Sequence, residues 1–281
     1  AGEIPETNFK CKETSYEACW STGDVLILSQ SGMRKIPRCL EKNPGFVSLD
    51  LSENEIEKIE NLDRLVKLEW LSLAKNNIEK IENLDAFIKL KRRYRVVTGL
   101  EWLDLVEKKI EDLDAFAKLK RLYLHENQIE KIEGLDALDS LEELGLSSNK
   151  IEKLEGLDSL TKLERLHLEN NKIEKIENLE TLTNLKELWL QDNEIEKIEN
   201  LDTLTELNWL WLWKNKIGKI ENLDKLSNLE WLNLENNQIG KIENFDMLEK
   251  LKTLSLGNNK IEKLEGLEKL TNLETFNVEG N

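Results

Sequence analysis

The chain of 281 residues has few of the side chains from which catalytic and metal sites are usually built. It contains two histidines and three cysteines, and the cysteines all lie near the start, at Cys11, Cys19 and Cys39. Three cysteines allow at most one internal disulfide and leave one thiol over. Because no His or Cys pair has ligand spacing and no nucleophile motif lies near a histidine, the sequence predicts no metal, no cofactor and no catalytic residue.

Long apolar runs are also absent, and basic residues are outnumbered by acidic ones, 40 to 56. No apolar stretch approaches the roughly 18 residues of a transmembrane helix, which predicts no membrane insertion. The formal net charge of −16 repels phosphate backbones and anionic membranes, so nucleic acid and lipid are poor partner candidates and a basic or mixed-charge protein surface is a better one. The absence of any Asn-x-Ser/Thr acceptor site argues against a glycosylating secretory route.

What the sequence has in abundance is an internal repeat. A Leu-x-Leu-x-x-Asn pattern recurs at Asn54, Asn76, Asn127, Asn149, Asn171, Asn193, Asn215, Asn237, Asn259 and Asn281. From Asn127 onward, the step is 22 residues each time. A fixed short period predicts a solenoid, in which no single unit closes a core by itself and the units must stack.

One unit, residues 182–203, reads LTNLKELWLQDNEIEKIENLDT. The segment that holds Leu188 and Leu190 has a period of two, which predicts a short strand with its leucines inward. The amide of Asn193 is expected to bond backbone groups left unpaired where the chain bends, and its repetition predicts a ladder through the stack. The spacing of three from Ile195 to Leu201 predicts a 3₁₀-like return along the convex side, with Glu and Lys as a solvated outer face.

The ends of the chain depart from the pattern. We expect an N-terminal cap and degenerate first repeat over 1–46, in which 25–37 form the degenerate unit and Cys11 or Cys19 is bonded to Cys39. Leucine-rich repeats are expected over 47–281, with an irregularity at 77–126. The chain stops at Asn281 in mid-repeat, which predicts that a C-terminal cap is absent.

The irregularity at 77–126 allows two interpretations, because Asn76 and Asn127 lie 51 residues apart. In the first, Thr98 takes the asparagine position and residues 100–113 form a helix on the convex side. In the second, Leu103 and Leu105 form a strand and residues 91–99 are an inserted loop. The segment also holds a basic cluster that either contacts an acidic partner or is a solvated loop, formed by Lys91, Arg92, Arg93 and Arg95.

The residues that flank the inward leucines point outward from the strands, onto the concave surface. Six of the eight tryptophans fall at these positions, namely Trp70, Trp189, Trp209, Trp211, Trp213 and Trp231, and Trp102 joins them in the second interpretation. Both histidines, His125 and His167, fall there too, whereas lysine is absent from these positions. Enrichment in Trp and depletion of Lys is typical of an interface centre.

The tryptophans cluster on three neighbouring strands, which makes an apolar patch typical of a binding site. The alternative is that they pack against one another on a curved inner surface or drive self-association. We predict a partner-binding site without catalytic or metal residues. It comprises Trp189, Trp209, Trp211, Trp213, Trp231, Glu187, Gln191, Glu235, Tyr123 and His167, with Asn233 as a further polar flank.

Two segments, NKIEKIENLETLTNLKELWLQDN and NKIEKLEGLEKLTNLETF, resemble the short 22-residue repeats of the leucine-rich-repeat regulatory subunit of protein phosphatase 1 and, more distantly, of the internalins. The resemblance covers 47–281 and implies an α/β, right-handed horseshoe solenoid with a parallel concave sheet and a 3₁₀ or irregular convex side. It also implies a phosphatase catalytic subunit bound by concave aromatic and acidic residues. The N-terminal MRKIPRCL looks more like the caps of extracellular leucine-rich-repeat proteins.

The leading hypothesis is a non-enzymatic scaffold that docks a partner protein on its tryptophan-rich concave face. One alternative is an extracellular or cell-surface recognition protein that binds a receptor or a glycan, since indoles also stack on sugars. Another is an engineered repeat protein without an evolved partner. The identity of the partner, the compartment and the oligomeric state stay open.

Overall fold

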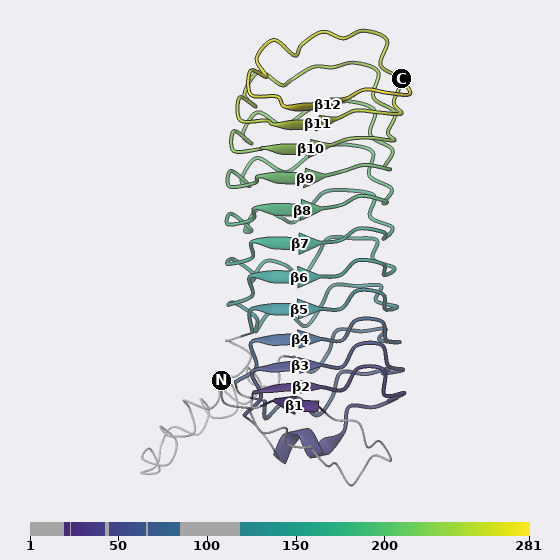
Figure 1. The fold of residues 1–281 in the computed structure, drawn as a ribbon, viewed down its shortest axis with the longest axis vertical. Helices are drawn as coiled ribbons and strands as arrows, with labels where there is room; N and C mark the ends of the chain where they lie inside the picture. The colour runs from purple at the N-terminus through teal and green to yellow at the C-terminus, as the bar shows by residue number, and fades with distance from the viewer. Residues whose placement is uncertain (1–19, 23, 43–44, 66, 85–118) are drawn as a thin grey trace, which may run out of the picture. The chain divides into compact units, whose positions relative to one another are not determined.

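The computed structural model describes residues 20–22, 24–42, 45–65, 67–84 and 119–281 (Figure 1). The chain divides into two compact units, one of residues 1–129 and 133–141, the other of residues 130–132 and 142–281. Each unit is built from short parallel strands joined by long irregular returns, and almost no helix is present among the described residues. The predicted parallel solenoid of leucine-rich repeats is confirmed.

The described residues of the first unit form five strands and one 3₁₀ helix. These are β1 (Trp20–Thr22), β2 (Val25–Ile27), η1 (Arg38–Lys42), β3 (Ser48–Asp50), β4 (Trp70–Ser72) and β5 (Arg121–Tyr123). Strand β1 pairs antiparallel with β2, and the pairs from β2 to β5 are parallel with the strand leucines in register. Cys39, in η1, is buried and disulfide-bonded, while Cys11 and Cys19 lie outside the described residues.

Strand β5 pairs directly with β4, although the sequence between them is long enough for further units. Trp70 is the partner of Arg121, and the Leu73 N–H donates to the Tyr123 carbonyl at 2.8 Å. The two strands are therefore neighbours in the sheet, and the segments on which the two interpretations of 77–126 differ, residues 91–113, are outside the described residues. Residues 85–118, with the basic cluster and Trp102, lie outside the described part of the chain.

The second unit contains seven parallel strands, each three residues long. These are β6 (Glu143–Gly145), β7 (Arg165–His167), β8 (Glu187–Trp189), β9 (Trp209–Trp211), β10 (Trp231–Asn233), β11 (Thr253–Ser255) and β12 (Thr275–Asn277). Each strand pairs with the next without any slip in register, so equivalent residues of successive repeats lie side by side, from teal to yellow in Figure 1.

Within each unit, the leucines and isoleucines of successive repeats form the core. In the repeat that contains β8, Leu188, Leu190, Ile195 and Ile198 are fully buried, as predicted from their spacing. Full burial of such a side chain contributes about 1.5–3 kcal/mol, and stacking brings together the contributions of every repeat. In the last turn the equivalent of Ile198 is Leu264, which is 62% exposed. The expected absence of a C-terminal cap stays a prediction.

The regular spacing of asparagine along the chain produces the predicted ladder of hydrogen bonds. The Asn193 amide donates to the carbonyls of Leu168 and Leu190, each at 3.0 Å, and its Oδ1 accepts from the Ile173 N–H at 3.0 Å. Its equivalents in neighbouring repeats, such as Asn215, make the same bonds. Each amide therefore joins its own turn to the preceding one, and it satisfies backbone groups that would otherwise be buried without partners.

The return segment differs from the expectation of a 3₁₀-like path. The stretch from Glu194 to Glu199 has no regular structure, and the three-residue bonds come later, from Leu204 N–H to the Leu201 carbonyl and from Leu207 N–H to the Leu204 carbonyl. Spacing of three in an apolar pattern does not distinguish a tight helix from an extended path with inward side chains. Stacking on the preceding turn favours the extended path, since the Glu194 N–H donates to the Ile173 carbonyl.

A second asparagine position, which the sequence reasoning did not single out, closes each return. Asn200 has a φ of 57°, and its amide donates to the Ile176 carbonyl of the preceding turn at 2.7 Å. In other repeats glycine takes this place, as at Gly156 with a φ of 68°. Asparagine and glycine tolerate this left-handed conformation better than other residues. The sequence signal for this position was the alternation of Asn and Gly at the same place in different repeats, as at Asn200 and Gly156.

We expect Asn193→Ala to lower the free energy of unfolding by at least about 2 kcal/mol, because two buried carbonyls and one buried N–H lose their partner. The matched control is Asn184→Ala, since Asn184 is exposed and makes one bond, to the Thr161 carbonyl. The control should change the stability by less than about 0.5 kcal/mol. Urea denaturation followed by circular dichroism measures both, and equal effects would contradict a structural role for the ladder.

Candidate functional site

The exposed side of β6 to β12 carries three columns of side chains, because each repeat places equivalent residues side by side. Glu187 and Trp209 are neighbours in the first column, and Trp189 and Trp211 in the second. The third column lies two residues beyond the end of each strand and holds Gln191 and its equivalents. We call the exposed side of β7 to β10, with Trp189, Trp209, Trp211, Trp213 and Trp231, the tryptophan face.

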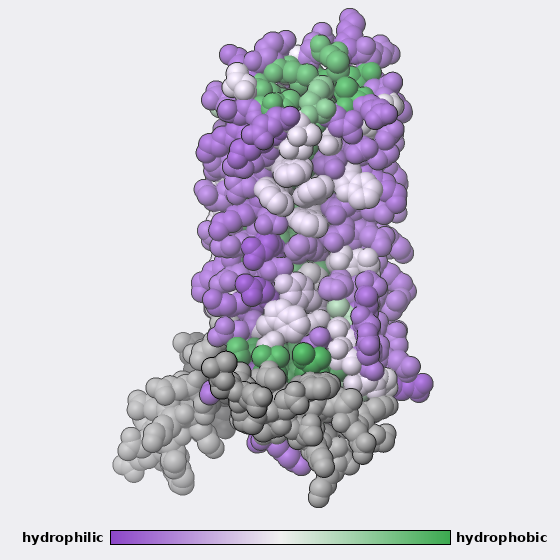
Figure 2. Space-filling model, viewed as in Figure 1, coloured by the Kyte–Doolittle hydropathy of each residue, from purple (hydrophilic) through white to green (hydrophobic). Residues whose placement is uncertain are grey.

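Four of these five tryptophans and one histidine form an unbroken series of ring contacts. The ring centroids lie 4.7 Å apart for His167 and Trp189, 5.7 Å for Trp189 and Trp211, 6.0 Å for Trp211 and Trp231, and 5.4 Å for Trp231 and Trp209. All five tryptophans stay partly exposed. Figure 2 shows side chains of intermediate hydropathy gathered over these strands, with hydrophilic residues on both sides.

Two ionisable side chains next to the aromatic series lie close to the Glu143 carboxylate. The Arg165 guanidinium contacts the Glu143 carboxylate at 3.2 Å, and His167 Nε2 lies 3.6 Å from the same carboxylate. Only 13% of the Glu143 side chain is exposed, so this pair is screened less by water than an ordinary surface pair. The positive charge of Arg165, next to the aromatic series, is therefore already compensated by Glu143.

Several polar atoms under the tryptophan face have no hydrogen-bond partner among the described residues. They are the indole Nε1 atoms of Trp189 and Trp211, Glu169 Oε2 and Gln191 Oε1. A buried donor or acceptor without a partner costs roughly 1–3 kcal/mol. Such atoms are uncommon in folded proteins and call for a physical reason.

Burial raises the pKa of the Glu169 carboxyl, and hydrogen bonds from its own backbone and from Ser147 offset this only in part. No cation contributes to the shift. A carboxylate without a counter-ion, covered by neighbouring side chains, is disfavoured in its charged form. Glu169 is therefore the charged residue of the face whose environment suits it least.

The structure brings together most, but not all, of the residues predicted for the site. The described part of the second unit places Glu187, Gln191 and Glu235 around the tryptophan series, with Trp213 in the third column. Tyr123 belongs to the first unit, where its ring lies 5.9 Å from Trp70 and 6.2 Å from His125. Burial lowers the pKa of His125, against the opposing effect of Glu126. The partner-binding role of all these residues stays a prediction.

Sequence reasoning passed over Glu143, Arg165 and Glu169, because acidic residues are so frequent in this chain that any one of them carries little information. A signal was nevertheless present. The step of 22 places Glu169 beside Gln191 in the third column, and Glu143 beside Arg165 in the first. Their outward position on the same strands as the aromatic residues distinguishes them from the glutamates of the returns.

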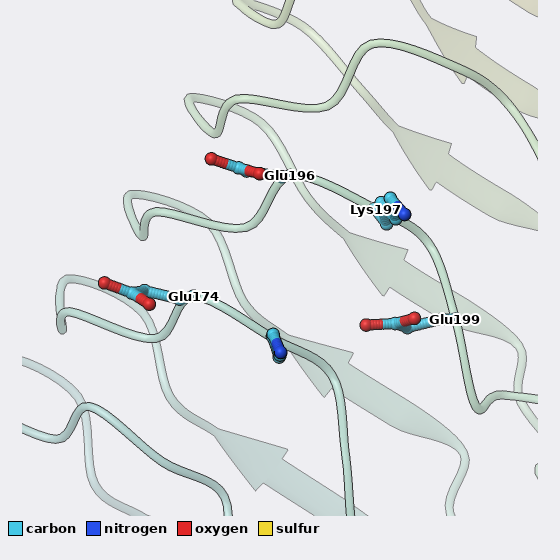
Figure 3. Close-up of a pocket in the computed structure, with 5 residues that line it drawn as sticks. Glu174, Glu196, Lys197 and Glu199 are labelled. Carbon is cyan, nitrogen blue, oxygen red and sulfur yellow. The ribbon is translucent and has the colours of Figure 1, made fainter.

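A surface hollow of about 250 Å³ lies on the return segments and not on the sheet (Figure 3). The charged residues that line it belong to the returns of two successive repeats and are Glu174, Lys175, Glu196, Lys197 and Glu199. Such alternating charge is typical of a solvated face. In the described residues no cluster of His, Cys, Asp and Glu has the makings of a metal site, and no helix is long and apolar enough to cross a membrane.

Family models for leucine-rich repeats match the chain over much of its length. The model for two copies of the repeat matches residues 117–159, 139–181, 161–203 and 249–281, and the model for one repeat matches 228–248. Proteins with these repeats generally act as protein-interaction scaffolds and are typically not enzymes. No curated protein matches the chain.

Solved structures of bacterial and plant proteins share the fold. The internalin InlF of Listeria monocytogenes is 25% identical with a TM-score of 0.66, over 96% of this chain and 79% of the internalin. A leucine-rich-repeat protein of Leptospira interrogans is 25% identical with a TM-score of 0.70, over 86% and 57%. The ectodomain of the Arabidopsis thaliana receptor kinase GASSHO1/SCHENGEN3, in complex with CASPARIAN STRIP INTEGRITY FACTOR 2, is 24% identical with a TM-score of 0.56, over 91% and 35%.

We expect Glu169→Gln to be more stable than the wild type at neutral pH, because glutamine accepts the same hydrogen bonds without a buried charge. The pKa of Glu169 is raised in the folded state, so the unfolded chain loses the proton first as the pH rises. The wild type therefore loses stability as the pH rises from the ordinary glutamate value through the folded pKa, and the difference between the proteins should vanish below 4.5.

Urea denaturation at neutral pH and at a pH below the ordinary glutamate pKa measures this difference. Glu180→Gln, at an exposed position, removes the same charge and should leave the stability nearly unchanged at both pH values. A Glu169→Gln protein less stable than the wild type at neutral pH would show that the carboxylate is well accommodated.

Proposed function

The chain belongs to the leucine-rich-repeat family, and on that premise we propose that it is a non-enzymatic binding module that docks a partner protein on the tryptophan face. The observation that carries the proposal is the series of four indoles in contact, all partly exposed on one side of the sheet. Aromatic residues at the centre of an interface contribute a large share of the binding energy.

The rigidity of the platform supports the same function. The tryptophans stand on strands whose backbone is held by parallel pairing and by the asparagine ladder. An indole has only two side-chain torsions, so ordering it on binding costs little conformational entropy. A partner therefore meets a surface that is largely organised in advance, which favours affinity.

The polar surroundings supply the rim that such an interface needs. Glu187 and Glu235 are partly exposed next to the indoles, and the Asn233 Oδ1 accepts a hydrogen bond from the Glu235 N–H at 3.0 Å. Polar groups around an apolar centre exclude water from it and provide specificity. The face therefore combines an apolar centre with acidic edges.

A phosphatase catalytic subunit is one partner to test. The repeat text at 171–193 and the combination of aromatic and acidic residues on one face support it. None of the relatives named above is a phosphatase regulator, so the assignment rests on the resemblance of the repeats.

Recognition outside the cell is a second candidate, favoured by the disulfide at Cys39. Disulfides persist in oxidising compartments and are rare in the reducing cytosol of most organisms. The same face would then bind a receptor or a glycan, with the indoles stacked on a protein surface or on sugar rings.

We expect Trp211→Ala to weaken partner binding by about thirtyfold or more, in keeping with the roughly 2 kcal/mol of an interface hot spot. Affinity capture from a lysate identifies the partner, and titration of the purified pair gives the affinity. Trp209→Ala should act in the same direction. The control is Met247→Ala, at a residue that is 53% exposed and lies outside the sheet. Equal affinities of all four proteins would place the binding site elsewhere.

For recognition outside the cell, we expect one free thiol in the unreduced protein, because one disulfide uses two of the three cysteines. Thiol titration under denaturing conditions, before and after reduction, gives the count. Three free thiols before reduction, together with no binding to a glycan array, would remove the second candidate and leave the first untouched.

A further inference from the structure

Glu169 differs from the other charged residues of the tryptophan face because no cation among the described residues contributes to its electrostatic environment. The one Lys or Arg at the outward positions of β6 to β12 is Arg165, which is paired with Glu143 at 3.2 Å. The attractions that raise the pKa of Arg165 come from Glu143, Glu187 and Glu164, and Glu169 is not among them. The positive charge of Arg165 in the first column is therefore compensated by Glu143, and the third column contains no Lys or Arg.

The neighbour of Glu169 in the third column offers a second acceptor that is also without a partner. The Asn170 N–H donates to the Gln191 carbonyl at 3.0 Å, so the parallel register places Gln191 directly beside Glu169. Gln191 is only 8% exposed, yet its Oε1 has no hydrogen bond among the described residues. The two side chains start roughly 4.8 Å apart, the spacing of neighbouring strands. Glu169 Oε2 and Gln191 Oε1 are thus two adjacent acceptors that one group with several donors could satisfy.

The indoles beside these acceptors add an aromatic surface and further hydrogen-bonding capacity. Trp189 and Trp211 lie in the second column with ring centroids 5.7 Å apart, and neither indole N–H has a partner. A cation over an indole face gains about 0.5–2 kcal/mol from the attraction of the ring. The N–H groups suit carbonyl oxygens of a peptide backbone that lies across the face.

The charge of the whole face favours a cationic partner group. The outward positions of β6 to β12 hold the carboxylates Glu143, Glu169, Glu187, Glu235 and Glu279 against the single guanidinium of Arg165, with no lysine. The chain as a whole carries a formal charge of −16. This excess attracts basic groups and repels acidic ones at long range.

We propose that the tryptophan face receives an arginine side chain of the bound partner protein, with its guanidinium on Glu169 and Gln191 and its plane against Trp189. This inference rests on the proposed function, since it names the chemistry by which the same face recognises its partner. Arginine fits better than lysine because its planar fork of donors matches two neighbouring acceptors and stacks on an aromatic ring.

Entry of the guanidinium requires the covering side chains to move. The four partnerless atoms are buried in the free protein, so an indole or the Gln191 side chain must rotate to admit the ligand. Neither indole N–H is hydrogen-bonded, so rotation of these rings breaks no hydrogen bond. The bound cation then compensates the buried charge of Glu169. Removal of this electrostatic penalty contributes favourably to the free energy of binding.

The test uses short glycine-serine peptides with one central residue, which is arginine, lysine or the neutral arginine isostere citrulline. Titration of each into the nitrogen-15-labelled protein follows the indole N–H resonances of Trp189 and Trp211, assigned with Trp189→Phe and Trp211→Phe. We expect the arginine peptide to shift both resonances, and the citrulline peptide to bind about tenfold more weakly, because it lacks the charge-assisted hydrogen bonds.

Glu169→Gln keeps the shape and should weaken arginine binding by about tenfold, whereas Glu180→Gln should bind like the wild type. Equal binding of arginine and citrulline peptides, or of the wild type and Glu169→Gln, would overturn the proposal. Loss of partner capture in Trp211→Ala without any arginine binding would leave the protein-binding function standing and remove only this inference. Arginine binding with undiminished capture in Trp211→Ala would instead contradict the proposed function.

Discussion

The rest of the fold depends on the hydrogen bonds that the buried asparagine amides make with the backbone. A chain that turns back every 22 residues must bend where each strand ends, and the bend leaves carbonyls and N–H groups without partners inside the core. Asn193 and its equivalents satisfy these groups in their own turn and in the preceding one. Because these backbone groups have hydrogen-bond partners, the other inward positions can be filled by apolar leucine side chains. The second asparagine or glycine position, as at Asn200, then allows the left-handed turn that begins the next repeat.

Because the core is assembled from inward positions alone, the outward positions of the strands are free to carry binding chemistry. The tryptophan face uses that freedom at some cost, since it exposes several indoles and leaves Glu169 and Gln191 without full hydrogen bonding. The buried leucines of the same repeats supply stability enough to tolerate it. Binding sites commonly concentrate such locally unfavourable features, and here they combine into a surface that is acidic, aromatic and short of partners.

Much of the fold followed from periodicity. The strand around Leu188, the ladder at Asn193 and the outward direction of Trp189 each depend on one spacing, and each is found as expected. The path of the return did not follow, because a spacing of three fits both a 3₁₀ turn and an extended segment that stacks on its neighbour. The neighbour of β4 in the sheet did not follow either, since spacing along the chain says nothing of which strand pairs with which. Direct pairing of β4 with β5 was therefore visible only in the structure.

The sequence by itself determined the repeat, the inward and outward residues, and the concentration of tryptophan on one face, because all of these depend on side-chain alternation and a constant step. The tertiary structure decided how neighbouring columns share their charges and hydrogen bonds. Glu143 and Glu169 are both glutamates at outward positions in the sequence, yet one is paired with Arg165 and the other has no cation among the described residues. That difference arises from burial and from the orientation of side chains between stacked turns, which the distance along the chain does not specify.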